Sequence, residues 1–212
     1  MSDDHGRGEL SLRRCLPGVA RTVVSMLPEG ARLLLGSSMP IRDVDAFAPP
    51  PPGAVRVLSN RGLNGIDGNL STALGVAAAS GAPTVALVGD LALLHDLGAL
   101  VHARRAGRPL TVVVVNNDGG GIFNFLPIAG ATPRFEALFG TPHGTDLSAA
   151  AALGEARFTR AETPEQLAAA LEDAGRPGLR IVEARVVDRA INVEVHQALG
   201  AAVARALEEG GP

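Results

Sequence analysis

The 212-residue sequence predicts an α/β domain whose mainly parallel six-stranded sheet is doubly wound, with helices on both faces. Short runs of branched apolar residues, bounded by Gly, Pro or Asn, are typical of strands that are buried on both faces. Segments with apolar residues at three-to-four spacing lie between these runs and indicate helices. Because strands and helices alternate along the chain, the crossovers favour parallel pairing of the strands.

The composition narrows the classes of function. Hydrophobic residues make up 46% of the chain and aromatic residues 3%, so the core is expected to consist mainly of Ala, Val, Leu and Ile. A net charge of −3 argues against a nucleic-acid partner, which needs a basic face. No apolar run reaches about 18 residues, which argues against a membrane partner. The single cysteine, Cys15, cannot form an internal disulfide, and we therefore expect a reducing, cytoplasmic location.

The first half of the chain begins with a polar segment, residues 1–15, which we interpret as a linker or a disordered start. The domain itself is expected over residues 16–212. Pro28 stops the first predicted helix, and the proline run at 49–52 predicts a stiff loop without sheet pairing. The expected elements are a helix over 17–27, a strand over 32–35, a helix from Pro40, a strand over 55–58 and a helix over 69–79.

The second half continues the alternation with two longer apolar strands, a Pro- and Gly-rich loop over 127–145 and a final helix. A loop of that length is typical of lids and subunit contacts. The last strand alternates Arg180, Glu183 and Arg185 with apolar residues, which predicts an exposed sheet edge. The expected elements are strands over 84–88, 110–115, 156–159 and 179–187, and helices from Asp90, over 146–153, from Thr163 to near Gly175 and over 192–207.

Polar turns follow two strands that one crossover connects. Gly89-Asp90 ends the strand over 84–88, and Asn116-Asn117 ends the strand over 110–115. A right-handed crossover brings such strand ends side by side, at the edge where open α/β sheets bind ligands. The Asp90 carboxylate, the Asn117 amide oxygen and the Gly119 carbonyl would form an all-oxygen set. That set suits Mg²⁺ holding a diphosphate.

This Gly-Asp followed by Asn-Asn resembles the signature of thiamine-diphosphate-dependent enzymes, with Leu91 in place of the usual second glycine. Three longer motifs narrow the resemblance: GSSMPIRD at 36–43, SNRGLNGIDGNLSTALG at 59–75 and NNDGGGIFNFLP at 116–127. Together they are similar to the C-terminal, diphosphate-binding domain of the thiamine-diphosphate-dependent synthases of menaquinone (vitamin K2) biosynthesis. The resemblance implies the thiamine-diphosphate-binding fold.

The resemblance also implies roles for individual residues. Thiamine diphosphate and Mg²⁺, or Mn²⁺, would be the cofactors, and Ile66 would support the bent conformation of the thiamine diphosphate. The metal would be held by Asp90, Asn117 and the Gly119 carbonyl. The cofactor-binding residues implied are Ile66, Gly89, Asp90, Leu91, Asn117, Gly119 and Ile122, and the substrate-binding residues implied are Ser38, Arg42, Arg61, Phe123 and Leu126.

The implied reaction decarboxylates 2-oxoglutarate and adds the resulting succinyl-semialdehyde unit to isochorismate, which makes the enzyme a C–C bond-forming transferase. Both substrates are carboxylates, and a guanidinium binds a carboxylate through two parallel hydrogen bonds. In this family the activating glutamate comes from the N-terminal pyrimidine-binding domain of a partner subunit in a homodimer or homotetramer. Neither that domain nor the middle domain has a match here. We therefore expect no catalytic side chain in this chain and no activity from it alone.

Several alternatives remain open on the residues alone. Another thiamine-diphosphate enzyme, of the 2-oxoacid decarboxylase or acetolactate-synthase type, would share the metal turns. A non-catalytic module that binds Mg²⁺-diphosphate groups would share the fold. Ser38 also suits a simple helix N-cap, and the glycines of 62–68 suit tight turns as well as a phosphate loop. His143 has no evident partner in the sequence pattern.

Overall fold

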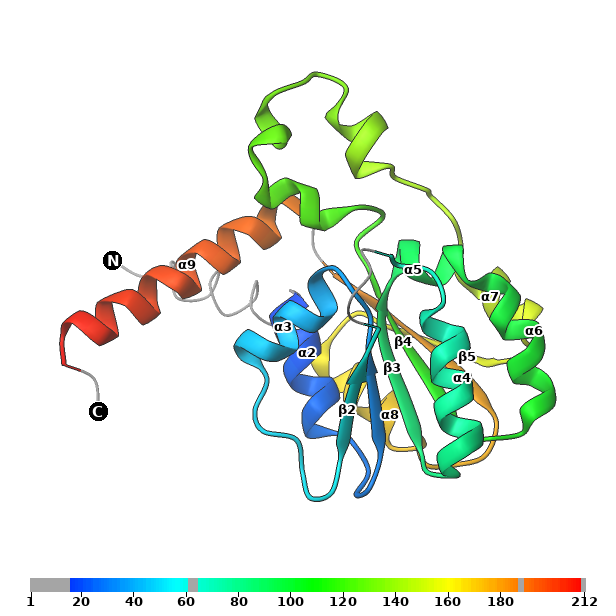
Figure 1. Ribbon diagram of the computed structural model, residues 1–212. Coiled ribbons are helices and arrows are strands. Elements are labelled where there is room, and N and C mark those ends of the chain that lie inside the picture. The colour runs from blue at the N-terminus through cyan, green and yellow to red at the C-terminus, as the bar shows by residue number, and fades with distance from the viewer. Residues whose placement is uncertain (1–15, 61–64, 187–188, 211–212) are drawn as a thin grey trace.

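The computed structural model describes residues 16–60, 65–186 and 189–210, which form a three-layered α/β domain (Figure 1). The central strands are apolar runs rich in Val and Leu, and Gly or Pro lies within three residues of most strand ends. The strands are β1 (Arg32–Leu35), β2 (Arg56–Ser59), β3 (Thr84–Gly89), β4 (Leu110–Asn116), β5 (Arg157–Ala161) and β6 (Leu179–Arg185). The α-helices are α2 (Leu16–Ser25), α3 (Met39–Phe47), α4 (Asn69–Ser80), α5 (Asp90–His95), α6 (Leu97–Ala106), α7 (Ser148–Leu153), α8 (Pro164–Leu171) and α9 (Arg189–Glu208).

All strand pairs are parallel, in the order β2-β1-β3-β4-β6-β5. From β1 the chain moves outward to β2 and then returns to place β3 on the other side of β1. The strand order therefore reverses between β1 and β3. In open α/β sheets the ligand crevice lies outside the carboxyl ends of the strands at such a reversal. The predicted fold class, a doubly wound parallel sheet of six strands, is confirmed.

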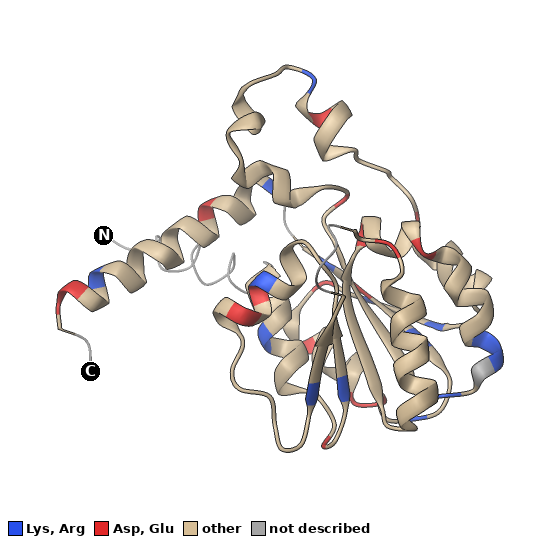
Figure 2. Ribbon diagram, viewed as in Figure 1, with Lys and Arg blue, Asp and Glu red and all other residues tan. Residues whose placement is uncertain are grey.

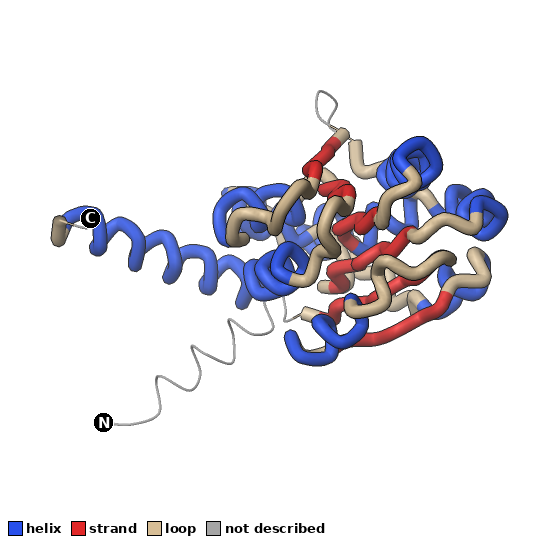
Figure 3. The backbone as a smooth tube through the Cα atoms, turned by 90° about the horizontal axis from the view of Figure 1, so that it is seen from below, coloured by secondary structure: helices blue, strands red, loops and turns tan. Residues whose placement is uncertain are grey.

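Two apolar cores lie on opposite faces of the sheet. One packs α4, α5, α6 and α7 against it, with Leu93, Leu100 and Leu147 fully buried. The other packs α2, α3 and α8 against it, with Val23 and Leu167 fully buried. Figure 3 shows helices on both sides of the strands. Because aromatic rings are few, these cores are built from aliphatic side chains, as the composition predicts.

The prediction that the last strand forms an exposed edge is wrong. β6 lies between β4 and β5, and six of its seven residues are buried. Its charged side chains have partners inside the protein: Glu183 is 1% exposed and pairs with Arg160, while Arg180 donates to the Arg176 carbonyl. Sequence alternation cannot distinguish a polar face that meets solvent from one that meets other polar groups.

Other boundaries differ by a few residues from the predicted ones. The single helix expected after Asp90 is two helices, which divide at Asp96, and α7 begins at Ser148 rather than at residue 146. The 127–145 segment contains short helical turns, η2 (Pro127–Gly130) and η3 (Glu136–Gly140), which follow η1 (Gly121–Phe125). These turns rise above the carboxyl edge of the sheet (Figure 1).

The last helix, α9, extends away from the body of the domain (Figures 1 and 3). Its first turns contribute buried Asn192 and Val195, whereas residues 201–208 are exposed. Acidic and basic residues are interspersed on other helices, strands and loops, whereas α4, β3 and β4 carry none (Figure 2). Within the described residues, no helix is both long enough and apolar enough to cross a membrane.

The sheet core is expected to dominate stability, which a matched pair of leucines can test. Leu34 in β1 is 0% exposed and Leu207 in α9 is 73% exposed. We expect Leu34→Ala to lower the free energy of unfolding by about 2–5 kcal/mol, because a buried cavity replaces the side chain. Leu207→Ala should change it by no more than about 0.5 kcal/mol. Urea unfolding of both variants measures the difference, and equal losses would contradict the assignment of the core.

Candidate functional site

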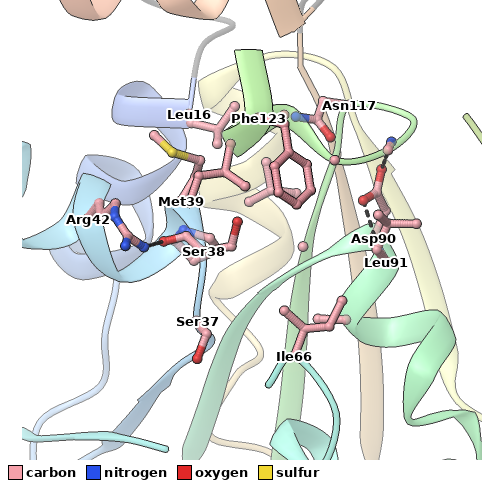
Figure 4. Close-up of a pocket in the computed structure, with 18 of the residues that line it drawn as sticks. Leu16, Ser37, Ser38, Met39, Arg42, Ile66, Asp90, Leu91, Asn117 and Phe123 are labelled. Carbon is pink, nitrogen blue, oxygen red and sulfur yellow. Dashed lines mark hydrogen bonds between the residues drawn. The ribbon is translucent and has the colours of Figure 1, made fainter. Parts of the chain in front are cut away.

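A cavity of about 700 Å³ opens at the carboxyl ends of β1, β3 and β4 (Figure 4). This is the position that the reversal of strand order predicts. Most of the lining residues belong to loops and helix starts that follow the strands. They lie within segments 37–42, 65–66, 89–92 and 115–123, together with Leu16 of α2.

Asp90 begins α5 immediately after β3 and is 2% exposed. Its Oδ2 accepts the Gly119 N–H at 2.9 Å, and its Oδ1 accepts its neighbour's N–H, that of Leu91, at 2.6 Å. Burial raises the pKa of Asp90 above its ordinary value, although the two N–H groups and the ring of His143 oppose that shift. A buried carboxylate of this kind favours a nearby positive charge.

The turn after β4 presents Asn117 and Gly119 opposite Asp90. Asp118 has a φ of 56° and Gly119 a φ of 133°, so the backbone reverses within two residues. The Asp118 Oδ1 accepts the N–H groups of His143 and Gly144 at 3.0 and 2.8 Å. These bonds lower the pKa of Asp118, the one from Gly144 most strongly. The turn is therefore fastened both to α5 and to the 127–145 segment.

The glycines of the turn are required by close approach. A Cβ on Gly119 would clash with the Gly140 carbonyl oxygen, and one on Gly120 would clash with the Phe139 carbonyl oxygen. The Gly120 N–H donates to that Gly140 oxygen at 2.7 Å. The glycines of this turn therefore let two backbone segments meet.

His143 has a partner that the sequence pattern did not reveal. Its Nε2 lies 3.4 Å from the Asp90 Oδ2 and 3.7 Å from the Asp118 Oδ1, and the side chain is 11% exposed. Among the described residues, this buried nitrogen has no hydrogen-bond partner of good geometry. The 127–145 segment therefore places an imidazole against the acidic group of the cavity.

The opposite wall comes from the start of α3. Ser38 occupies the N-cap position with a φ of 74° but makes no side-chain capping bond, so the simple N-cap interpretation does not account for it. Arg42 is exposed and its Nη1 donates to the Ser38 carbonyl at 2.6 Å. Figure 4 shows Ser38 and Arg42 across the cavity from Asp90. A cationic side chain and a hydroxyl thus face the acidic turn.

Apolar residues complete the cavity. Ile66, Leu91, Ile122 and Phe123 line it, as does Met39 (Figure 4). Phe123 also contacts Phe139 edge-to-face, with ring centroids 5.6 Å apart. The cavity is consequently polar at the strand ends and apolar between them, a division that suits a ligand with a charged end and an apolar ring.

The structure brings ten of the predicted site residues to this cavity. They are Ser38, Arg42, Ile66, Gly89, Asp90, Leu91, Asn117, Gly119, Ile122 and Phe123. Leu126 lies outside the lining and is 49% exposed. Arg61 lies outside the described residues. The roles of all these residues toward a ligand remain predictions.

Other lining residues were not predicted. Met39 and Gly120 lie inside the quoted motifs, so their neighbours could have indicated them. Leu16 gives no such signal, because it stands at the end of a polar segment and reaches the cavity only when α2 packs on the sheet. His143 is hidden for the same reason, since its approach to Asp90 depends on the path of a long loop.

His196 of α9 connects the two walls of the cavity. Its ring packs edge-to-face between Phe47 of α3 and Phe125 of η1, with centroids 5.1 Å away on each side. Its Nε2 lies 3.0 Å from the Oδ1 of Asp43, which is 1% exposed. α3 contributes Arg42 to the cavity and η1 contributes Phe123. The terminal helix therefore holds both walls in a fixed relation.

The donor set suits a divalent cation that bridges to a diphosphate. Asp90 supplies a buried carboxylate, Asn117 an amide, and Gly119 a carbonyl on a backbone where a side chain would clash. Mg²⁺ is bound by one or two carboxylates and completes its shell with other oxygens, those of substrate phosphates above all. No group of three His, Cys, Asp or Glu side chains suited to a metal occurs in the described part of the chain, so a single carboxylate would bear this role.

The fold and the site define a doubly wound domain with a cavity at the carboxyl edge of its sheet that suits a metal-diphosphate group. The sequence matches the family model of the thiamine pyrophosphate enzyme C-terminal TPP binding domain over residues 47–184. The chain belongs to this family of thiamine-diphosphate-binding domains. The resemblance inferred from the Gly-Asp and Asn-Asn turns is thereby confirmed.

Curated relatives agree with the narrower resemblance. A 2-succinyl-5-enolpyruvyl-6-hydroxy-3-cyclohexene-1-carboxylate synthase from Myxococcus xanthus is 61% identical over 196 residues, which cover 92% of this chain and 33% of the relative. The synthase of the same name from Chloroflexus aurantiacus is 45% identical over 195 residues, 92% of this chain and 33% of the relative. The chain thus spans about a third of the length of these relatives.

A solved structure supports the fold. Benzoylformate decarboxylase from Polynucleobacter necessarius superposes with a TM-score of 0.65 at 20% identity, over 81% of this chain and 33% of that chain. At this identity the similarity is one of fold alone.

Gly119 tests whether the close approach in the turn is necessary. We expect Gly119→Ala to abolish Mg²⁺-dependent binding of thiamine diphosphate, because the added Cβ would clash with the Gly140 oxygen at a φ of 133°. Gly98→Ala is the matched control, since no atom lies within 4 Å of its added Cβ in α6. Isothermal titration of both variants provides the measurement. Unchanged binding by Gly119→Ala would show that the turn tolerates a side chain.

Asp43 gives the domain a pH-dependent stability. Burial raises the pKa of Asp43 from 3.8, against the opposing effect of His196. Between 3.8 and that raised pKa, the folded state keeps a proton that the unfolded state releases, so the free energy of unfolding falls as the pH rises. We expect Asp43→Asn to flatten this fall. Urea unfolding from about pH 4 to about pH 7 would detect the difference, and parallel pH profiles would contradict it.

Proposed function

We propose that the chain is the diphosphate-binding domain of a 2-succinyl-5-enolpyruvyl-6-hydroxy-3-cyclohexene-1-carboxylate synthase of menaquinone biosynthesis. The synthase decarboxylates 2-oxoglutarate and adds the succinyl-semialdehyde unit to isochorismate. One observation supports this best: a single cavity combines the buried Asp90 carboxylate, Asn117 and Gly119 with Ser38 and Arg42 on the facing wall. The identity to synthases of that name supports the same proposal.

The chain's own residues would bind and orient the reactants. Asp90, Asn117 and the Gly119 carbonyl would hold Mg²⁺ or Mn²⁺, which would supply positive charge for a diphosphate. Gly89 and Leu91 flank Asp90 at the same edge, and Ile66 and Ile122 provide apolar surface for the rings of thiamine diphosphate. When bound, this cofactor supplies the electron sink for decarboxylation. The protein provides position, a dry surface and charge.

Arg42 and Arg61 would bind the carboxylates of the two substrates. Arg42 stands at the cavity wall, with one nitrogen on the Ser38 carbonyl and the rest of its guanidinium available for an anion. The Ser38 hydroxyl adds a hydrogen bond, and Phe123 and Leu126 add apolar contact. A dicarboxylate donor such as 2-oxoglutarate accounts for these arginines better than pyruvate does.

The domain would depend on the remaining parts of the enzyme. The activating glutamate is expected from the pyrimidine-binding domain of a partner subunit, in a homodimer or homotetramer. We therefore propose that the 212-residue chain has no turnover of its own, and that no side chain in it acts as a catalyst. The single Cys15 favours a cytoplasmic enzyme.

The test joins this domain to the pyrimidine-binding and middle domains of a synthase relative. Consumption of 2-oxoglutarate and isochorismate is followed with Mg²⁺ and thiamine diphosphate. We expect turnover, and a loss of at least about 100-fold in Asp90→Ala, because the metal loses its only carboxylate. Asp45→Ala is the matched control, since Asp45 is exposed on α3 and does not line the cavity. The isolated chain should show no turnover.

The outcomes separate the alternatives. Turnover of pyruvate in place of 2-oxoglutarate would favour an enzyme of the decarboxylase or acetolactate-synthase type. Metal-dependent binding of diphosphates without turnover of any 2-oxoacid would favour a non-catalytic module. Equal activity in the Asp90→Ala and Asp45→Ala enzymes would remove Asp90 from the site.

A further inference from the structure

We propose that Asn116 and Glu183 are positioning residues for the metal-binding turn, which they hold from behind the sheet edge. Neither residue lines the cavity. The proposal rests on the proposed function, because it concerns the turn that presents Asn117 and Gly119 to the metal. It gives a structural role to the buried side chain of Glu183, a residue that the sequence pattern predicted at an exposed edge of the sheet.

Glu183 is the buried residue that holds the Asn116 side chain. The residue is 1% exposed and lies in β6, which pairs with β4 along its whole length. Its Oε2 accepts the Arg160 Nε–H at 2.7 Å, and the Arg185 Nε lies 3.3 Å from its Oε1. The two guanidinium groups compensate the charge of Glu183. Both Glu183 oxygens therefore face N–H donors and act as hydrogen-bond acceptors.

This acceptor determines which way the Asn116 amide faces. The Asn116 Nδ2 donates to the Glu183 Oε1 at 2.7 Å. Because a carboxylate cannot donate, the reverse orientation would place two acceptors in contact. The Asn116 Oδ1 is therefore directed toward the chain, where it accepts the Asp118 N–H at 3.0 Å. The Asn116 carbonyl also accepts the Val186 N–H at 3.1 Å, which ties its backbone to the end of β6.

The hydrogen bond to Asp118 lies at the point where the turn reverses. Asp118 has a φ of 56°, a conformation that needs support in a residue with a side chain. The next N–H, that of Gly119, donates to the Asp90 Oδ2. Arg160, Glu183, Asn116, the turn and Asp90 thus form one continuous hydrogen-bonded series that runs across β5, β6, β4 and the end of β3.

A reciprocal exchange of the amide and the carboxylate tests the direction of this bond. In Glu183→Gln the new amide allows the Asn116 side chain to turn over, which removes the acceptor from Asp118. In Asn116→Asp two carboxylates face each other. In the double variant the amide introduced in β6 can donate to the carboxylate introduced in β4, whose second oxygen again accepts the Asp118 N–H. The double variant should therefore recover what each single variant loses.

The first measurement needs no metal. Amide hydrogen exchange of the 212-residue chain reports protection at Asp118. We expect faster exchange at this amide in each single variant and restored protection in the double variant. Leu34→Ala, which removes a buried side chain from β1, controls for a general loss of stability. Unchanged protection in both single variants would overturn the proposal.

The second measurement reports the metal. Electron paramagnetic resonance follows Mn²⁺ binding by the same chain with thiamine diphosphate in excess. We expect about 10- to 100-fold weaker binding in each single variant, recovery in the double variant and no change in Leu34→Ala. Equal weakening of Mn²⁺ binding in Leu34→Ala would show that Asn116 and Glu183 only stabilise the fold, and it would overturn the positioning role.

Failure of the proposed metal site would be visible separately. If Mn²⁺ binding were the same in Asp90→Ala as in the unmodified chain, the assignment of the metal site would be wrong. The exchange at the Asp118 amide would still decide whether Asn116 and Glu183 hold the turn.

Discussion

The hydrogen bond between the Gly119 N–H and the Asp90 carboxylate joins the ends of two central strands, and the site depends on it. Asp90 follows β3 and Gly119 follows β4, so this contact fixes how the two polar turns face each other. The carboxylate is almost fully buried, and its charge must be compensated where it stands. Two backbone N–H groups and the ring of His143 surround the carboxylate.

Close packing around this contact explains why glycines occupy the turn after β4 and why the 127–145 segment lies against that turn. The backbone at Gly119 and Gly120 passes so near the carbonyl oxygens of Phe139 and Gly140 that side chains cannot be accommodated. The 127–145 segment therefore packs against the turn after β4, although none of its residues lines the cavity. His143 and Gly144 are fastened to Asp118, and His143 approaches Asp90. The 127–145 segment and the turn after β4 therefore pack together as one structural unit.

The terminal helix, α9, contacts the two elements that form opposite walls of the cavity, α3 and η1. α9 inserts His196 between Phe47 and Phe125, which belong to opposite walls. Its outer half leaves the body of the domain and is exposed, so the packing that matters to the cavity lies in its first two turns. Contacts within the chain consequently set the distances between Asp90, the wall that carries Arg42 and the apolar surface between them.

The sequence by itself determined the six strands, their parallel pairing and the two polar turns that meet at one edge. These features depend on local signals, namely β-branched runs, glycine and proline boundaries, and the period of the helices, which can be interpreted without knowledge of neighbours. The family was also determined, because its motifs are contiguous. The division at Asp96 was not predicted, since helix ends depend on tertiary packing.

Only the tertiary structure decided where β6 lies, how His143 approaches Asp90, and that Leu16 but not Leu126 reaches the cavity. Each of these facts depends on contacts between residues far apart in the chain. Glu183 and Arg185, two positions apart on one face of the strand, have the same appearance in the sequence whether that face meets water or meets Arg160 and Asn116. The physical reason is that sequence periodicity identifies a polar face, whereas burial depends on which other segment covers it.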